Sequence, residues 1–327
     1  MESFVFALNA VAPIIIIVAL GYFLKKTGWM ELDFAKKINK LVFHVFLPAM
    51  LFLNVYKIES TSGLALGYIL YAVVGVLIVF AISLPLVMAV TKNADRRGVL
   101  LQATFRSNYA LVGIPLAEML FGEGGVLGAT LLSAAIVPLL NVLGVVSLSI
   151  FSSSGRPNVK KILLGVIKNP LILGVVLGII VLGIRAIFIQ VGINLRLSEI
   201  KPIYTVLEYL SRLATPLALL ALGAQFDFAA VTKLRREIIF GTVMRVCAVP
   251  LFGVGMAYLL FRNTFDGAQF AALIAVFGTP VSVSSVPMTQ EMGGDYKLAG
   301  QLVIWSTLFS TLSVFLASFL LKLAGVF

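Results

Sequence analysis

The chain has 327 residues, of which 60% are hydrophobic and 12% are charged, and its mean hydropathy is +1.07. Soluble domains are about half apolar and about a quarter charged, so this composition excludes a water-soluble domain and indicates a polytopic membrane protein. One cysteine and one histidine exclude a disulfide framework and a zinc cluster. The net charge of +11 is spread over short basic segments between apolar runs, which indicates membrane orientation and excludes nucleic acid as a partner.

Apolar segments long enough to cross a bilayer recur along the whole chain. A spanning helix needs about 20 mostly apolar residues. The first such segment lacks the basic start and the cleavage site of a signal peptide, so it is predicted to be a span. By this measure the sequence predicts an all-α protein with ten transmembrane helices, over residues 4–24, 35–56, 64–90, 98–121, 125–151, 169–188, 203–225, 236–261, 267–290 and 297–321.

Lysine and arginine are distributed unevenly between the two sides of these spans. One side carries Lys25, Lys26, Lys36, Lys37, Lys40, Lys92, Arg96, Arg97, Arg156, Lys160, Lys161, Lys168, Lys233, Arg235, Arg236 and Lys297. The other side carries only Lys57, Arg185, Arg196, Lys201, Arg262 and Lys322. The positive-inside rule predicts that the richer side is cytoplasmic. The sequence therefore predicts a multi-pass protein of the cell (inner) membrane, with both termini outside.

The polar segment SSSGRPNVKK (152–161) divides the chain into two five-span halves, 1–155 and 156–327, within one membrane domain. An odd number of spans in each half places the halves in opposite orientations, which predicts an inverted repeat. The second span of each half supports the relationship, because each contains a proline in an apolar run, LPAMLFLN at Pro48 and TPLALLAL at Pro216.

The fourth span of each half is interrupted in a similar way. NYALVGIP (108–115) and PVSVSSVP (280–287) both end in proline, and both are followed by Glu-Met and then by glycine with an acidic residue. Proline removes a backbone donor and glycine permits irregular backbone. In lipid such a break persists only when it is buried in protein or lines a cavity. The two breaks predict crossing fourth and ninth helices whose half-helix N-termini bind an anion at the midplane.

These features resemble the auxin efflux carrier family of membrane transporters, in particular its bacterial members described as malate or malonate permeases. The resemblance covers nearly the whole chain and includes TPVSVSSVP, MTQEMGGD and QLVIWSTLFS. It implies a scaffold and a moving transport unit, with alternating access to a small organic anion at the crossing. The positions that match the two crossovers are Asn108, Gly113 and Pro115 in the first and Pro280, Ser284, Ser285 and Pro287 in the second. The loop between the halves is short, unlike that of plant members, which argues against auxin as the substrate.

Two arginines lie deep inside predicted spans. Arg106 and Arg245 each follow the basic end of their span by nine residues, about 13 Å along a helix. Neither has an acidic residue three or four positions away, so we expect each to bind a carboxylate of the substrate bidentately. The alternative is that both side chains snorkel to the cytoplasmic interface. Arg212 differs, because Glu208 precedes it by one turn and is expected to pair with it.

Glu118 and Glu291 are the candidates for coupling to protons, although solvated positions at helix ends are the alternative for both. The sequence predicts no cofactor and no metal site, and it leaves open proton coupling, sodium coupling and a homodimer. The predicted partners are a small organic anion and the lipid bilayer.

Three functional classes compete with each other. An enzyme would need a nucleophile with a base, which the spans lack, and a cation/proton antiporter would carry acidic residues beside the breaks. The predicted function is therefore secondary transport of a dicarboxylate such as malate or malonate. The alternative is a sodium-coupled organic-anion symporter of the bile-acid type, since hydroxyls and unwound carbonyls also bind sodium.

Overall fold

The computed structural model describes residues 2–57, 66–151, 164–190 and 196–326. Within these ranges every regular element is a helix, and one isolated antiparallel bridge joins Ser107 to Val281. The ten predicted spans coincide largely with helical residues, but the fourth is interrupted at 106–108 and the ninth at 278–284. The segment predicted to separate the two halves lies outside the described residues. The helical stretches that are long and apolar enough to cross a membrane are Leu32–Tyr56, Leu66–Val90, Tyr109–Ile150, Pro170–Ile189, Lys201–Gln225, Arg235–Phe261 and Tyr296–Leu323.

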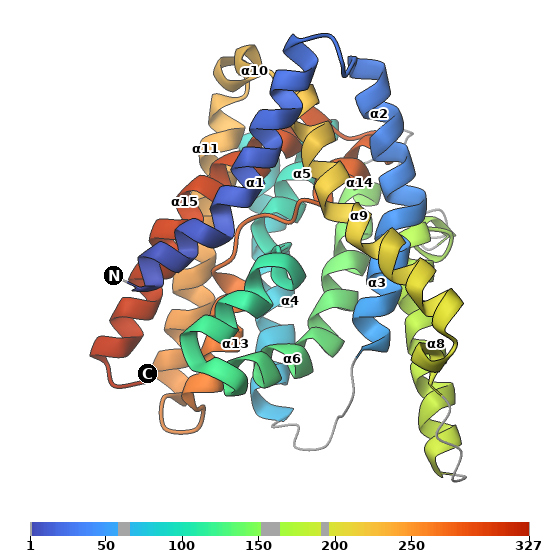
Figure 1. The fold of residues 1–327 in the computed structure, drawn as a ribbon. Coiled ribbons are helices and arrows are strands. Elements are labelled where there is room, and N and C mark those ends of the chain that lie inside the picture. The colour runs from blue at the N-terminus through green and yellow to red at the C-terminus, as the bar shows by residue number, and fades with distance from the viewer. Residues whose placement is uncertain (1, 58–65, 152–163, 191–195, 327) are drawn as a thin grey trace.

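The helices follow one another along the chain with few long connections (Figure 1). Their bounds are α1 (Glu2–Lys26), α2 (Leu32–Leu41), η1 (Val42–Phe46), α3 (Leu47–Tyr56), α4 (Leu66–Val90), α5 (Ala94–Phe105), η2 (Tyr109–Gly113), α6 (Ile114–Ile150), α8 (Pro170–Gln190), η3 (Leu197–Glu199), α9 (Lys201–Gln225), α10 (Phe228–Lys233), α11 (Arg235–Val243), η4 (Met244–Ala248), η5 (Leu251–Gly255), α12 (Met256–Phe261), α13 (Gly267–Phe277), α14 (Ser285–Glu291) and α15 (Tyr296–Leu323).

Prolines explain three of the π-helical turns. Pro48, Pro115 and Pro250 each follow a π-helical turn, and the residue four positions before each proline lies within η1, η2 or η4. Proline cannot donate to the carbonyl four residues back and its ring clashes with that carbonyl. A π-bulge widens the preceding turn and relieves the clash without ending the helix.

The long helix α6 contains the boundary between the predicted fourth and fifth spans. Phe121 and Gly122 have non-helical backbone angles, and Gly122 has a φ of 57°, which is accessible mainly to glycine. Two helices therefore meet at a sharp kink at this point, between the predicted ends at 121 and 125.

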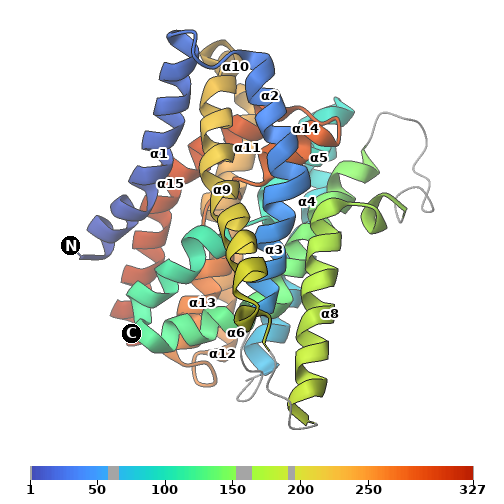
Figure 2. The ribbon, with the colours of Figure 1, turned by 45° about the vertical axis from the view of Figure 1, so that its right-hand side comes forward.

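The helices form two groups (Figures 1 and 2). In the first, which we call the α9 group, α1, α2, α3 and α8 pack mainly around α9 and on each other. In the second, the crossover group, α4, α5, α6 and α11–α15 pack together, with α13 against α6 and α11 against α15. Glycines allow close packing inside the α9 group, where a Cβ on Gly174 would approach the Pro48 carbonyl oxygen to 2.5 Å.

Large apolar side chains lie exposed on the outer helices. Leu70 of α4 is 63% exposed and Leu177 of α8 is 53% exposed, and many similar side chains surround them on the same helices. A water-soluble protein rarely exposes such a continuous apolar surface. The structure is therefore that of a multi-pass membrane protein with apolar, lipid-facing helices.

Several of the loops predicted to be cytoplasmic lie at one end of the bundle. Lys297 at the start of α15 pairs with Asp227, which follows α9, at 3.2 Å. Arg96 of α5 pairs with Asp295, which precedes α15, also at 3.2 Å. The α1–α2 connection lies at the same upper end in Figure 1. The basic residues of these loops therefore share one face.

Candidate functional site

The two predicted helix breaks lie against each other. Helix α5 ends at Phe105 and the chain becomes helical again at Tyr109, whereas the second break separates α13 from α14. The Asn108 amide donates to the Pro280 carbonyl at 2.8 Å, and the Ser282 amide donates to the Arg106 carbonyl at 3.0 Å. The two extended segments therefore satisfy each other's backbone groups, which a break at membrane depth requires.

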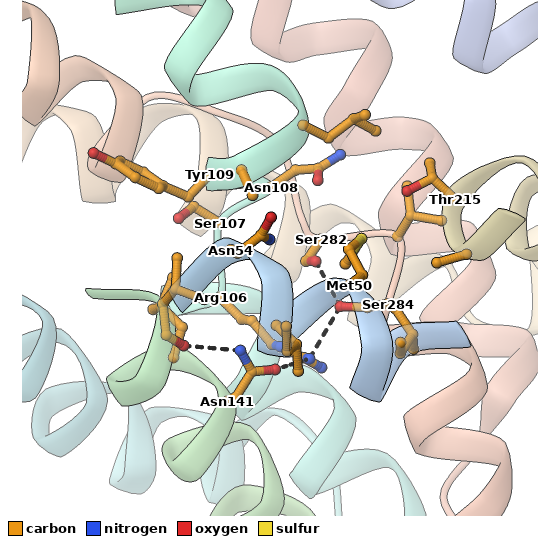
Figure 3. Close-up of a pocket in the computed structure, with 18 of the residues that line it drawn as sticks. Met50, Asn54, Arg106, Ser107, Asn108, Tyr109, Asn141, Thr215, Ser282 and Ser284 are labelled. Carbon is orange, nitrogen blue, oxygen red and sulfur yellow. Dashed lines mark hydrogen bonds between the residues drawn. The ribbon is translucent and has the colours of Figure 1, made fainter. Parts of the chain in front are cut away.

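A pocket with a volume of about 130 Å³ lies beside this crossing. Helices α3 and α9 form one wall, and the first break, the second break and α6 form the other, as Figure 3 shows. The pocket therefore lies at the boundary between the α9 group and the crossover group. It is lined by Leu47, Met50, Leu51, Asn54, Arg106, Ser107, Asn108, Tyr109, Ala110, Leu111, Val137, Leu140, Asn141, Ala214, Thr215, Ala218, Ser282, Val283 and Ser284.

Arg106 is the only charged residue among the described residues that line the pocket. Its side chain is 1% exposed, and the Nη2 atom donates to the Asn141 Oδ1 at 2.9 Å and to the Ser284 Oγ at 3.0 Å. The Nη1 atom donates to Gln102 Oε1 at 3.2 Å. Because the side chain is buried, it does not snorkel to the interface. All of these hydrogen-bond partners are neutral, and no ion pair within the described residues neutralises the charge of Arg106.

Asn108 and Ser107 add polar atoms that the protein leaves unused. The Asn108 Nδ2 and the Ser107 Oγ are buried, and neither has a hydrogen-bond partner within the described part of the chain. A buried donor without a partner costs about 1–3 kcal/mol, so such atoms are rare in native proteins and call for an explanation. Both residues line the pocket.

The helix that begins at Tyr109 points its N-terminal end at the pocket. Tyr109, Ala110 and Leu111 all line the pocket, and the helix continues to the kink at Phe121 and Gly122. The first N–H groups of a helix have no intrahelical partner, and this end carries a partial positive charge. Arg106 and the helix end therefore give the pocket a positive potential suited to an anion.

The predicted site residues did not include the pocket residues Ser107, Tyr109 and Ser282 of the two breaks, nor three polar residues of the surrounding helices: Asn54, Asn141 and Thr215. Each of these last three lies close to a proline inside an apolar helix, and two belong to the LPAMLFLN and TPLALLAL segments. A polar residue beside a helix-interior proline was the signal that would have identified them.

The other predicted residues of the breaks shape the crossing without lining the pocket. A Cβ on Gly113 would lie 3.0 Å from the Ala275 carbonyl oxygen, so this glycine permits η2 to pack closely against α13. The Ser285 hydroxyl donates to the Ser282 carbonyl at 2.6 Å. Among the described residues that line the pocket there is neither Gly113 nor Ser285, and the three prolines of the breaks are also absent from the lining: Pro115, Pro280 and Pro287.

Arg245 is buried but does not line the pocket. Its guanidinium donates to the backbone carbonyls of Thr279 at 2.7 Å, Val276 at 2.7 Å and Thr104 at 3.2 Å. It neither snorkels nor faces the pocket, in contrast to both sequence-based interpretations. The structure thus separates the two arginines that looked equivalent in the sequence.

The two coupling candidates also lie away from the pocket. Glu118 is exposed on α6, and the Glu291 Oε2 lies 3.9 Å from the Nδ1 atom of His44. Arg212 lies 3.8 Å from Glu208, the partner that the helical spacing predicted. In the described part of the chain no group of three or more His, Cys, Asp or Glu side chains is arranged to hold a metal ion.

Comparisons with known proteins identify the family of this chain. The chain matches the membrane transport protein family over residues 6–159 and 144–318. It is 23% identical to an uncharacterized transporter of Methanothermobacter thermautotrophicus over 310 residues, which is 94% of this chain and 95% of that protein. It is 25% identical over 318 residues to an uncharacterized transporter of Methanocaldococcus jannaschii, covering 96% of this chain and 98% of the relative. The chain therefore belongs to the membrane transport protein family, which is the auxin efflux carrier family.

Proposed function

We propose that this protein is a secondary transporter of a small organic anion, a dicarboxylate such as malate or malonate, which binds in the crossover pocket. One observation carries the proposal: Arg106, whose guanidinium is uncompensated, and Asn108, whose side-chain amide is unpaired, line the same pocket. A carboxylate accepts hydrogen bonds from both groups and supplies the negative charge that the protein does not provide. Intramembrane charge is costly, and its presence favours a functional role.

The charge of the pocket favours anions over cations. Within the described residues its lining contains one arginine, three asparagines and no aspartate or glutamate. A cation would have to bind beside Arg106 and at the positive end of the helix that starts at Tyr109. This arrangement supports the anion carrier over the cation/proton antiporter.

The size of the pocket favours a small substrate. A cavity of roughly 150 Å³ in a protein core binds benzene, so about 130 Å³ accommodates a short dicarboxylate but not a steroid. This supports a four-carbon or three-carbon acid and counts against a bile-acid type of substrate.

Alternating access would move the crossover group against the α9 group, with the pocket at their boundary, as expected for two inverted five-helix halves. The polar contacts between the groups near the basic end include the Lys297–Asp227 ion pair and three hydrogen bonds at 3.0 Å: Asn39 Nδ2 to Gln290 Oε1, Gln290 Nε2 to the Lys36 carbonyl, and Gln301 Nε2 to the Asp227 carbonyl. Such contacts are weak enough to break in each transport cycle.

The test is uptake of radiolabelled malate and malonate into proteoliposomes under imposed proton, sodium or electrical gradients. We expect wild type to accumulate a dicarboxylate, and Arg106→Gln and Asn108→Ala to lose at least about tenfold in uptake, the equivalent of roughly 1.4 kcal/mol of binding. Arg212→Gln is the matched control, because Arg212 is 74% exposed and lies outside the pocket. Normal uptake by Arg106→Gln, or no uptake of either acid by wild type under any gradient, would contradict the proposal.

A further inference from the structure

Arg245 binds the carboxyl ends of two broken helices at once. The residue lies in the π-helical turn η4, is fully buried, and forms no ion pair within the described residues. Two of its hydrogen bonds reach the end of α13, at the carbonyls of Val276 and Thr279, and the third reaches the last turn of α5 at Thr104. One guanidinium therefore joins both sides of the crossing.

The carbonyls that Arg245 binds are those that the breaks leave without helical partners. The last carbonyls of a helix have no intrahelical donor, and this end carries a partial negative charge. Neighbouring carbonyls are satisfied within the chain: the Thr279 hydroxyl donates to Ala275 at 2.7 Å, and the Arg106 amide donates to Gln102 at 2.9 Å. Arg245 completes this set, because its guanidinium donates to the carbonyls of Thr104, Val276 and Thr279.

In carriers with broken helices, unwound carbonyls and the C-terminal ends of half-helices coordinate a transported cation. In this protein the same kind of oxygen atoms receive the N–H groups of an arginine. The guanidinium remains charged in proteins at all working pH values, and its planar fork matches several carbonyls simultaneously.

We propose that Arg245 is a resident cation that occupies the carbonyl site at the crossing, so that no sodium ion binds there and transport proceeds without sodium. The sodium statement rests on the proposed function, whereas the role of Arg245 as a bound cation does not. Arg245 is thus a positioning residue: it neutralises the two negative helix ends and holds both breaks in the geometry that places Arg106 and Asn108 in the pocket.

The test exploits the fact that a resident cation can be replaced by a free one. Purified protein without substrate is melted in sodium chloride and in choline chloride. We expect the same melting temperature for wild type in both salts. Arg245→Ala leaves three buried carbonyls without a donor, so its melting temperature is expected to fall by about 5 °C or more. Guanidinium at millimolar concentration should restore a large part of that loss, whereas urea at the same concentration should not.

The matched control is Arg235→Ala, an exposed arginine at the start of α11, which should melt like wild type and gain nothing from guanidinium. If Arg245→Ala does not fold, Arg245→Lys and Arg245→Met take its place: the lysine variant retains a cation and should fold, whereas the methionine variant should not. A folded methionine variant with a wild-type melting temperature would overturn the proposal.

Two further results would also overturn the proposal. One is a saturable rise in the wild-type melting temperature with sodium, and the other is a melting temperature of Arg245→Ala that responds to neither guanidinium nor sodium. Because these measurements contain no substrate, they are independent of the uptake assay. A wild type that is indifferent to sodium but does not take up dicarboxylates would refute the proposed substrate and leave the role of Arg245 intact.

Discussion

The backbone amide of Asn108 donates a 2.8 Å hydrogen bond to the carbonyl of Pro280, and this bond joins two helix breaks that lie far apart in the sequence. The same residue keeps its side-chain Nδ2 without a partner in the described part of the chain. The two donors of Asn108 therefore differ, because the backbone amide joins the two breaks while the side-chain amide has no partner within the described residues. Proline at position 280 has no N–H group and disfavours continuation of α13, and its carbonyl lies in the non-helical segment that Asn108 binds.

The charge of Arg106 makes Asn141→Asp an informative substitution. The Asn141 Oδ1 accepts from the Arg106 Nη2 at 2.9 Å, and a carboxylate of nearly the same shape would form a charge-assisted pair at that position. We expect the variant to retain or raise the melting temperature and to lose at least about tenfold in dicarboxylate uptake, since an internal anion takes the place of the substrate's carboxylate. Melting curves and proteoliposome uptake measure the two effects. Uptake equal to that of wild type would show that the substrate does not use Arg106.

The volume of the pocket allows a steric test. Thr215 of α9 lines the pocket, so a phenylalanine there would occupy much of the roughly 130 Å³ available to a ligand. We expect Thr215→Phe to reduce uptake by at least about tenfold with little change in melting temperature. Leu213→Phe is the matched control, because Leu213 is 43% exposed on the same helix and does not line the pocket. Equal uptake by both variants would place the substrate elsewhere.

The breaks could be predicted from the sequence because proline, glycine and polar residues are rare in apolar runs, so each one changes the local pattern. The kink at Gly122 and the bulges before Pro48 and Pro115 follow from the same local rules. The residues that cause the kink and the bulges lie within a few positions of each of them. Prediction of the helical segments therefore needed no knowledge of tertiary structure.

The roles of Arg106 and Arg245 could not be separated in the same way. Both follow a basic helix end by nine residues and lack an acid one turn away, so their local patterns are alike. In the structure Arg106 contacts the side chains of Asn141 and Ser284, whereas Arg245 contacts only backbone carbonyls. Those partners come from distant segments, and their identity depends on how the helices pack. The sequence marks Asn54 and Thr215 as polar residues in proline-containing apolar segments, but their position in the pocket depends on how α3 and α9 pack at the crossing.

Close packing between α1 and α9 depends on glycine at position 223. A Cβ added to Gly223 would collide with the carbonyl oxygen of Val18, and one added to Gly21 would collide with that of Leu220. Overpacking of this kind costs about 1–3 kcal/mol, so Gly223→Ala should lower the melting temperature by several degrees. Gly183→Ala on α8 is the control, because nothing lies within 4 Å of its added Cβ. The control should be neutral or slightly stabilising, as alanine is the better helix former. Equal melting of the two variants would mean that α1 is free to move away from α9.

Acid should weaken the contact between Lys297 and Asp227 at the basic end of the bundle. The hydrogen bond from the Lys297 ammonium, at 3.2 Å, is the main cause that holds the pKa of Asp227 below its usual value of 3.8. A depressed carboxyl pKa stabilises the folded state above the unfolded pKa, and that contribution disappears as the pH falls through the folded pKa. The ion pair is exposed to solvent, so the effect is small and decreases further with salt.

Lys297→Gln should therefore melt below wild type near neutral pH at low salt, and the difference should disappear as the pH falls through the lowered pKa of Asp227 in the folded state. Lys322→Gln is the control: Lys322 lies in the last turn of α15 and forms no ion pair within the described residues. Melting temperatures measured across this pH range for the three proteins give the comparison. If the difference between wild type and Lys297→Gln stays constant down to the lowest pH, Lys297 stabilises the fold through packing of its aliphatic stem and not through the charge of Asp227.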